Sequence, residues 1–399
     1  MAHQINEIYE QAQFQLIRLP HIHTPPKIAK IIYVNSGTIM ALVSNSIHFI
    51  WDEDKSASSS EWTTAPQRGS IIRQWKSSIL GLKKTVVPND TPRDGVVPCF
   101  ALCGDNERLA SASGGAIRAF SMKLRVPLYN ILPIHARGPT IPTSIIYHPK
   151  DSNIIIIGTE DSFILVHKIL EMEDVALKKG HSKRVTGLAI TDSGDLLVST
   201  GADARICVWS KGDHEGPRQN AVYLEFPQGT PIPPSDTLVE FHRDQKHILV
   251  IHKLQLSQYE TRWLARLNQW VVPDCYGYIS HATYSCDGKL VYAGFTDGAI
   301  RIFNAASLVI KCRIDPNAYL PPSRLSIAHS LVIAAHPERP NQIAVGVAYD
   351  GFYVLESHES WEKRDSCLGK RTWEISNDPP RYSRHIGTST QGGLINIQK

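Results

Sequence analysis

The stretch that decides the fold is GHSKRVTGLAITDSGDLLVSTGADARICVW, which runs from Gly180 to Trp209. It contains three short apolar runs, VTGLAI, LLVST and RICVW, and the polar turns TDSGD and GADA separate them. The runs are rich in β-branched residues and are too short for helices. The stretch therefore predicts three antiparallel β-strands joined by tight turns.

The same phrase recurs along the whole chain. We count seven copies, which begin at Ile28, Val97, Pro142, Val185, Thr237, Ile279 and Leu331. From the second copy on, the first turns are 42 to 51 residues apart, close to the ~40–45-residue period of four-stranded propeller blades. Such blades have no core of their own and must close into a ring. The predicted fold is an all-β, seven-bladed β-propeller.

The ends of the chain and one insert interrupt this pattern. Residues 1–26 predict either a leader or a strand that closes the ring, and residues 27–369 hold the propeller. The Ser-, Pro- and Lys-rich insert at about 55–92 predicts a mobile loop in the outer strand of the first blade. Residues 370–399 predict an irregular C-terminal tail.

Composition excludes several classes of protein. The 399 residues are 42% hydrophobic and carry a net charge of +4, which excludes disorder of the whole chain and gives little support to nucleic-acid binding. Seven cysteines without tight pairing favour a reducing compartment. No segment approaches the roughly 20 apolar residues of a membrane span or has the pattern of a signal peptide.

The quoted stretch resembles a WD40 repeat, with a Gly-His pair at its start and a tryptophan on the third strand. The resemblance implies a buried hydrogen-bonded chain of His181, Ser199, Asp203 and Trp209. A nucleophilic Ser-His-Asp triad is the alternative interpretation, but a serine in the middle of a strand beside a tryptophan argues against it. We expect a structural aspartate in the same turn of three other blades, at Asp161, Asp297 and Asp350.

The sequence predicts no metal site, no cofactor and no enzymatic activity. Cys99 with Cys103 and His21 with His23 are close pairs, but neither has a second pair at zinc-site spacing. There is no phosphate-binding G-x-x-x-x-G-K-[ST] loop. Acids, bases or metal ligands that converge in the central channel would favour an enzyme, and a channel of small and apolar residues would exclude one.

Basic residues are the candidate contacts for a partner. Lys183 and Arg184 end the basic run KKGHSKR. We expect Arg118, Arg205 and Arg301 at the same place in the third strands of their blades. The alternative interpretation of all five is that they are solvated charges beside the strands.

At the level of whole phrases the sequence resembles the C-terminal WD40 propeller of the plant Topless and Topless-related transcriptional corepressors. The resemblance extends from about Leu16 to Leu355 and rests on IIYVNSGTIMALVSNSIHFIW, SASGGAIRAFSM, YHPKDSNIIIIGTEDSFILVHK, FPQGTPIPPSDT, ISHATYSCDGKLVYAGF and CRIDPNAYLPPS. The family's helical N-terminal region, which tetramerises and captures leucine-rich motifs, has no counterpart in this sequence. We therefore do not expect motif capture in the usual manner of the family.

The resemblance implies a non-enzymatic protein-interaction scaffold that acts as a transcriptional corepressor in the nucleus, with the cytoplasm as a further compartment. The expected partners are transcription factors and adaptor or chromatin-associated repressor proteins, without direct binding to nucleic acid or membranes. The alternative function is a WD40 substrate receptor of a cullin-RING ubiquitin ligase. Such receptors commonly carry WD-x-R after the third strand, where this chain reads WDED, VWSKG and IFNAA.

Overall fold

The computed structural model describes residues 6–8, 14–19, 27–44, 48–53, 75–79, 98–112, 115–124, 126–131, 134–135, 138–210, 221–226, 235–273, 276–320 and 331–357. Most of the insert expected at 55–92, the tail expected at 370–399, and the pair His21 and His23 lie outside the described residues. Within them no helix has the length and hydropathy that a membrane span requires.

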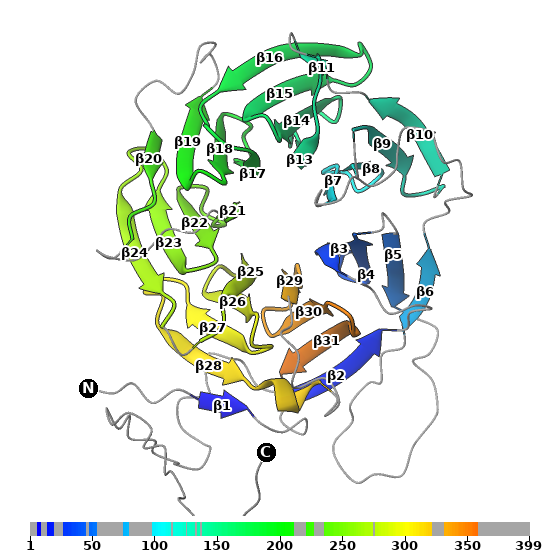
Figure 1. Cartoon of the computed structure of the whole chain (residues 1–399). Coiled ribbons are helices and arrows are strands. Elements are labelled where there is room, and N and C mark those ends of the chain that lie inside the picture. The colour runs from blue at the N-terminus through cyan, green and yellow to red at the C-terminus, as the bar shows by residue number, and fades with distance from the viewer. Residues whose placement is uncertain are drawn as a thin grey trace, which may run out of the picture.

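The described residues form seven antiparallel blades around a central axis, as the sequence predicted (Figure 1). Blade 1 contains β3 (Ile28–Asn35), β4 (Thr38–Val43), β5 (His48–Glu53) and β6 (Trp75–Ile79). Blade 2 contains β7 (Cys99–Leu102), β8 (Arg108–Ala112), β9 (Ile117–Ser121) and β10 (Val126–Ile131). Blade 3 contains β13 (Pro142–Tyr147), β14 (Ile154–Thr159), β15 (Phe163–Lys168) and β16 (Glu173–Lys179). Blade 4 contains β17 (Val185–Ile190), β18 (Leu196–Gly201), β19 (Arg205–Ser210) and β20 (Ala221–Tyr223).

The remaining strands complete the ring. Blade 5 contains β21 (Thr237–Phe241), β22 (His247–His252), β23 (Gln255–Glu260) and β24 (Arg266–Val271). Blade 6 contains β25 (Ile279–Tyr284), β26 (Leu290–Phe295), β27 (Ile300–Asn304) and β28 (Ile310–Ile314), and a 3₁₀ turn, η3 (Pro316–Ala318), follows it. Blade 7 contains β29 (Leu331–Ala335), β30 (Gln342–Val347) and β31 (Gly351–Ser357). A small hairpin of β11 (Ile134–His135) and β12 (Gly138–Pro139) links blades 2 and 3.

The N-terminal residues belong to the last two blades. The strand β2 (Phe14–Leu19) pairs antiparallel with β31 and is the outer strand of blade 7. The strand β1 (Asn6–Ile8) pairs in parallel with β28 and gives blade 6 a fifth strand. Ile8 and Phe14 are buried in the core that blades 6 and 7 share. The propeller therefore includes residues upstream of position 27.

The hydrophobic core lies between neighbouring blades. Ile206 and Val208 on β19, for example, pack in one cluster with Ile248 and Val250 on β22 of the next blade. All six residues of β26 are buried, as expected of a strand covered on both sheet faces. This explains why the phrases contain apolar residues at successive positions and not only at alternate ones.

Side chains of the inner strands bond the backbone of the next blade. Thr186 Oγ1 on β17 donates to the carbonyl of Thr237 at 2.7 Å, and Ser280 Oγ on β25 donates to the carbonyl of Leu331 at 2.8 Å. Because these bonds lie at the channel, they fix the register between blades close to the axis. The sequence did not indicate this function for the polar residues of the inner strands.

The ring has two faces. The upper face carries the turns between the second and third strands and the connections that lead into each inner strand. The lower face carries the turns between the first and second strands. There His242 Nε2 contacts the carbonyl of Gly288 in the next blade at 3.0 Å, and His336 Nε2 contacts that of Ser36 at 3.1 Å. A Cβ at Gly288 would lie 2.5 Å from His242 Nε2, so only glycine permits this close approach.

Candidate functional site: the upper face of blade 4 and the central channel

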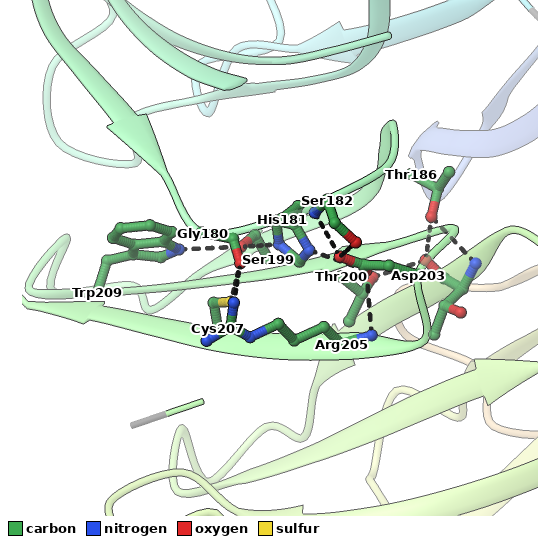
Figure 2. A network of polar contacts seen from close by, with 11 residues as sticks. Gly180, His181, Ser182, Thr186, Ser199, Thr200, Asp203, Arg205, Cys207 and Trp209 are labelled. Atoms are coloured by element: carbon green, nitrogen blue, oxygen red, sulfur yellow. Dashed lines mark hydrogen bonds and ion pairs between the residues drawn. The ribbon is translucent and has the colours of Figure 1, made fainter. Parts of the chain in front are cut away.

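The four residues that the WD40 resemblance singled out form one chain of hydrogen bonds (Figure 2). His181 Nδ1 lies 3.1 Å from Asp203 Oδ1, and His181 Nε2 lies 2.8 Å from Ser199 Oγ. Trp209 Nε1 donates to the same serine oxygen at 2.9 Å. The chain thus ties the connection before blade 4 to its second and third strands.

Burial gives this chain a structural function. Ser199 is 0% and Trp209 is 1% exposed, so a substrate cannot reach the serine hydroxyl. The indole N–H of Trp209 also donates to that hydroxyl. A nucleophilic serine needs its hydroxyl free for a substrate, so this bond argues against the alternative interpretation as a triad. The geometry is that of a satisfied buried polar network.

Asp203 is the ionised end of the network. Burial opposes its ionisation, but hydrogen bonds from His181 and from the Ser182 and Arg205 amides outweigh burial and lower the pKa of Asp203 to about 2. Arg205 extends the network, since its Nη1 donates to the carbonyl of Gly180 at 2.6 Å. At neutral pH the carboxylate therefore holds the Gly-His connection in place.

The other turn aspartates divide into two groups. Asp161 accepts a hydrogen bond from Thr140 Oγ1 at 2.5 Å, and Asp297 pairs with Arg301. Both lie midway between the paired residues of the second and third strands, as Asp203 does in blade 4. Asp350 lies one position later, because Val347 pairs with Gly351 across a turn whose left-handed residue is Tyr349. Asp350 therefore lies in the expected turn but one position later in it, and it accepts from Tyr353 Oη.

Lys183 and Arg184 lie on the upper face beside the channel. Lys183 is exposed. Arg184 donates to Asp236 of blade 5, with Nη2 at 2.7 Å from Oδ1, and its Nη1 lies 4.0 Å from Glu160 of blade 3. Arg184 therefore spans three blades at the channel mouth, with about a third of its side chain exposed.

Two expectations about the third-strand arginines need correction. Arg118 and Arg301 occupy equivalent positions in their third strands, where they pair with Ser111 and Ala293 of the second strands. In blade 4 this position is Cys207, so Arg205 lies two residues before it. Arg301 is 1% exposed and cannot be a contact for a partner. The cause of its burial is a sandwich: its guanidinium carbon lies 4.1 Å from the ring centroid of Tyr276 and 4.0 Å from that of Phe295. Arg118 is half-buried in β9.

The inner strands enclose a channel of about 460 Å³. Alanine, isoleucine, leucine, threonine and serine side chains form most of its wall, but titratable residues line it in addition to those at the mouth, among them Lys30, Cys99, Glu240 and His281. Lys30, Cys99 and His281 pair with the same position of their second strands and hence lie at one level. Sequence reasoning missed this group, although the shared position within the phrase could have indicated it.

Burial shifts the pKa values of the channel residues. It lowers the pKa of Lys30, lowers that of His281 to about 4, raises that of Glu240 to about 7 and raises that of Cys99 to about 12. Cys99 is therefore a protonated thiol at neutral pH and a poor nucleophile. Glu240 accepts from Thr283 Oγ1 of the next blade at 3.1 Å, and Lys30 Nζ donates to the Phe100 carbonyl at 3.2 Å.

The hydrogen bonds of these channel residues run to neighbouring blades. Within the described part of the chain, no hydrogen bond or ion pair joins Lys30, Cys99, Glu240 and His281 to one another. Each of Lys30 and Glu240 bonds a neighbouring blade instead. The channel thus falls between the two outcomes foreseen from the sequence: most of its wall is small and apolar, but it also holds titratable groups with perturbed pKa values.

Comparison with known proteins places this arrangement in a class. The family WD domain, G-beta repeat matches residues 173–210, which comprise the outer strand of blade 3 and the first three strands of blade 4. The fold and this repeat define a WD40 β-propeller.

Protein TOPLESS of Arabidopsis thaliana is 41% identical over 362 residues, 89% of this chain and 31% of that protein. Topless-related protein 1 of Arabidopsis thaliana is 38% identical over 392 residues, 97% of this chain and 33% of that protein. Protein TPR3 of Oryza sativa subsp. japonica is 38% identical over 359 residues, 90% of this chain and 31% of that protein.

The chain is therefore homologous to the Topless and Topless-related proteins over about nine tenths of its own length. It spans about a third of the length of these relatives.

Proposed function

We propose that this chain is a non-enzymatic protein-interaction scaffold that acts in transcriptional corepression in the nucleus. The similarity to Topless proteins over about nine tenths of the chain carries the proposal, because it covers the connections between blades as well as the strands. Loops held by a rigid scaffold bind partners with a small ordering cost, which suits a propeller to this function.

The upper face around the channel mouth is the proposed contact surface. Lys183 is exposed there, and Arg184 is held by Asp236 and Glu160 in one orientation. A basic group that is both accessible and fixed can recognise a carboxylate of a partner protein with little loss of entropy. We expect transcription factors and adaptor or chromatin-associated repressors as partners.

Other functions have less support. A net charge of +4 over 399 residues gives no basic field of the kind that binds nucleic acid without sequence preference. The cullin-RING receptor is not favoured, since WD-x-R is absent from the compared positions and the relatives reported above are Topless proteins.

Affinity capture from plant nuclear extract tests the proposal. The full chain serves as bait beside two double variants of equal charge change: Lys183→Glu with Arg184→Glu on the upper face, and Lys150→Glu with Lys246→Glu in exposed turns of the lower face. We expect the wild type and the lower-face variant to retain repressor and chromatin proteins, and the upper-face variant to lose them.

Each other outcome has a defined meaning. If the wild type captures no repressor or chromatin component, the corepressor function is contradicted. If both variants retain the same partners, the choice of face is wrong. Far-ultraviolet circular dichroism of both variants checks that the ring remains folded.

A further inference from the structure

The turn between β21 and β22 on the lower face of blade 5 carries three metal-ligand side chains in the sequence HRDQKH. His242 Nδ1 lies 3.0 Å from Asp244 Oδ2, and His247 Nδ1 lies 2.6 Å from the same oxygen. Among the residues that the structure describes, this is the one group of three or more His, Cys, Asp or Glu ligand atoms within 4.8 Å of one another.

The hydrogen bond of His242 to the next blade decides its tautomer. The Gly288 carbonyl can only accept, so His242 Nε2 carries a proton. In the neutral imidazole the lone pair then lies on Nδ1, where it accepts the Asp244 amide at a long 3.3 Å. The Nδ1 atom therefore lies 3.0 Å from a carboxylate oxygen, and either a metal cation or a proton lies between these two acceptors.

The equivalent histidines of two other blades show what is particular to blade 5. His148 Nδ1 accepts two backbone amides, at 3.3 and 3.2 Å, and His336 Nδ1 accepts two, at 3.0 and 2.9 Å. His242 Nδ1 accepts one amide, because this turn is one residue shorter and the Gln245 amide donates to the His242 carbonyl at 2.9 Å instead. The Nδ1 atom of His242 is therefore left with fewer backbone donors than in the other two blades, and Asp244 Oδ2 lies beside it.

We propose that His242, Asp244 and His247 bind a Zn²⁺ ion through two Nδ1 atoms and one carboxylate oxygen, with a fourth position open to solvent. Imidazole and carboxylate are suitable zinc ligands, and a three-residue set with one open position is a known coordination pattern. The Gly288 carbonyl accepts from His242 Nε2 and so fixes the orientation of the imidazole. This site is independent of the proposed scaffold function.

The geometry requires only a small adjustment. Ligand atoms of a tetrahedral zinc site are roughly 3.3 Å apart when each lies about 2.0–2.1 Å from the ion. His242 is already close to this separation from Asp244, and His247, now 2.6 Å away, must move outward by roughly 0.7 Å. Its side chain is 38% exposed and has room to do so.

Isothermal titration of ZnCl₂ into the chelator-stripped full chain at about pH 7.5 tests the site, since metal binding needs deprotonated ligands. We expect wild-type protein to bind with micromolar affinity. His247→Ala removes one ligand and leaves the bond between His242 and Gly288 intact, and Asp244→Asn replaces the carboxylate by a weaker ligand. Each should reduce the affinity about 10- to 100-fold.

The variant His21→Ala with His23→Ala is the matched control, because it removes the other close pair of histidines in the sequence. We expect it to bind Zn²⁺ as the wild type does. The proposal is overturned if wild-type protein binds no Zn²⁺ below about 1 mM, or if His247→Ala and Asp244→Asn bind as tightly as wild type. The first result would mean that a proton on His242 supplies the cation.

Discussion

His48 Nε2 lies 3.0 Å from Ser111 Oγ, and the two residues belong to adjacent blades. Ser111 pairs with Arg118 in the register in which Ser199 pairs with Cys207, so the two serines occupy equivalent positions. In blade 4 the imidazole comes from the connection before the blade, and in blade 2 it comes from β5 of the preceding blade. A serine at this position is thus satisfied by histidine through two different routes.

This equivalence predicts unequal costs for two serine substitutions. Ser199→Ala leaves both Trp209 Nε1 and His181 Nε2 without their partner, and Ser111→Ala leaves only His48 Nε2. Because an unsatisfied buried polar group costs about 1–3 kcal/mol, we expect losses in the free energy of unfolding of about 3 and about 1.5 kcal/mol. Urea denaturation measures both.

Ser182→Ala is the control for these variants, since Ser182 is exposed and its backbone amide, not its side chain, makes the shorter bond to Asp203. We expect a change below about 0.5 kcal/mol. Equal losses for Ser199→Ala and Ser182→Ala would contradict the buried network.

Asp203 predicts a dependence of stability on acidity. Its pKa is lowered from 3.8 to about 2 in the folded protein, so its stabilising contribution is complete above the unfolded value and is lost as the pH falls from 3.8 toward 2. Asp203→Asn should be less stable than wild type at neutral pH, and the difference should shrink over this range. Thermal unfolding at a series of pH values measures it, with Asp195→Asn as an exposed control.

Glu240 should make the stability of the protein depend on pH in the opposite direction. Burial raises its pKa from 4.5 to about 7, so the folded state holds a proton that the unfolded state releases, and stability falls as the pH rises from 4.5 through 7. Glu240→Gln keeps the acceptor for Thr283 and removes the buried charge. We expect it to stabilise the protein by about 1 kcal/mol at pH 7, a figure reduced because the channel is partly open to solvent.

The gain in Glu240→Gln should disappear below pH 4.5, where wild-type Glu240 is protonated in both states. The exposed Glu173→Gln is the control and should show no such change. A destabilised Glu240→Gln at pH 7 would mean that the attraction between Lys30 and the carboxylate outweighs burial.

We expect substitution of Arg301 to lower the free energy of unfolding strongly, although the residue is charged. Its Nη2 donates to Asp297 at 2.8 Å, and the guanidinium packs against the rings of Tyr276 and Phe295. Arg301→Ala leaves Asp297 without its partner and opens a cavity, so we expect a loss of about 3–5 kcal/mol. Arg301→Lys keeps the charge but loses the planar stacking, so it should retain only part of the stability that Arg301→Ala loses. A loss below about 1 kcal/mol on urea denaturation of Arg301→Ala would contradict this assignment.

The sequence predicted the blades because their period and strand chemistry are local properties. It also predicted which residues of blade 4 come together, since the Gly-His pair and the tryptophan define a known repeat. It did not predict the burial of Arg301, because Tyr276 lies outside the strands that define the phrase and reaches the guanidinium only in three dimensions. The contacts of Lys30 and Glu240 were missed for the same reason, since each bonds a different blade.

The position of Asp350 shows a second limit. Its sequence, AYDG, looks like the turns of the other blades, but the left-handed residue is Tyr349, and the strand register shifts the aspartate by one place. A shift of one residue in a turn leaves no mark on the apolar pattern of the flanking strands. Only the strand pairing reveals it.

The pairing of β2 with β31 has a consequence for synthesis of the protein. In the order of synthesis, the strand that fastens the ring precedes the seven blades, and its partner, which ends at Ser357, leaves the ribosome more than 300 residues later. At about 5–20 residues per second, Phe14–Leu19 waits for tens of seconds while the blades between form one after another. During that interval the unpaired edge of the nascent chain is open to aggregation, and chaperone contact would be most useful there.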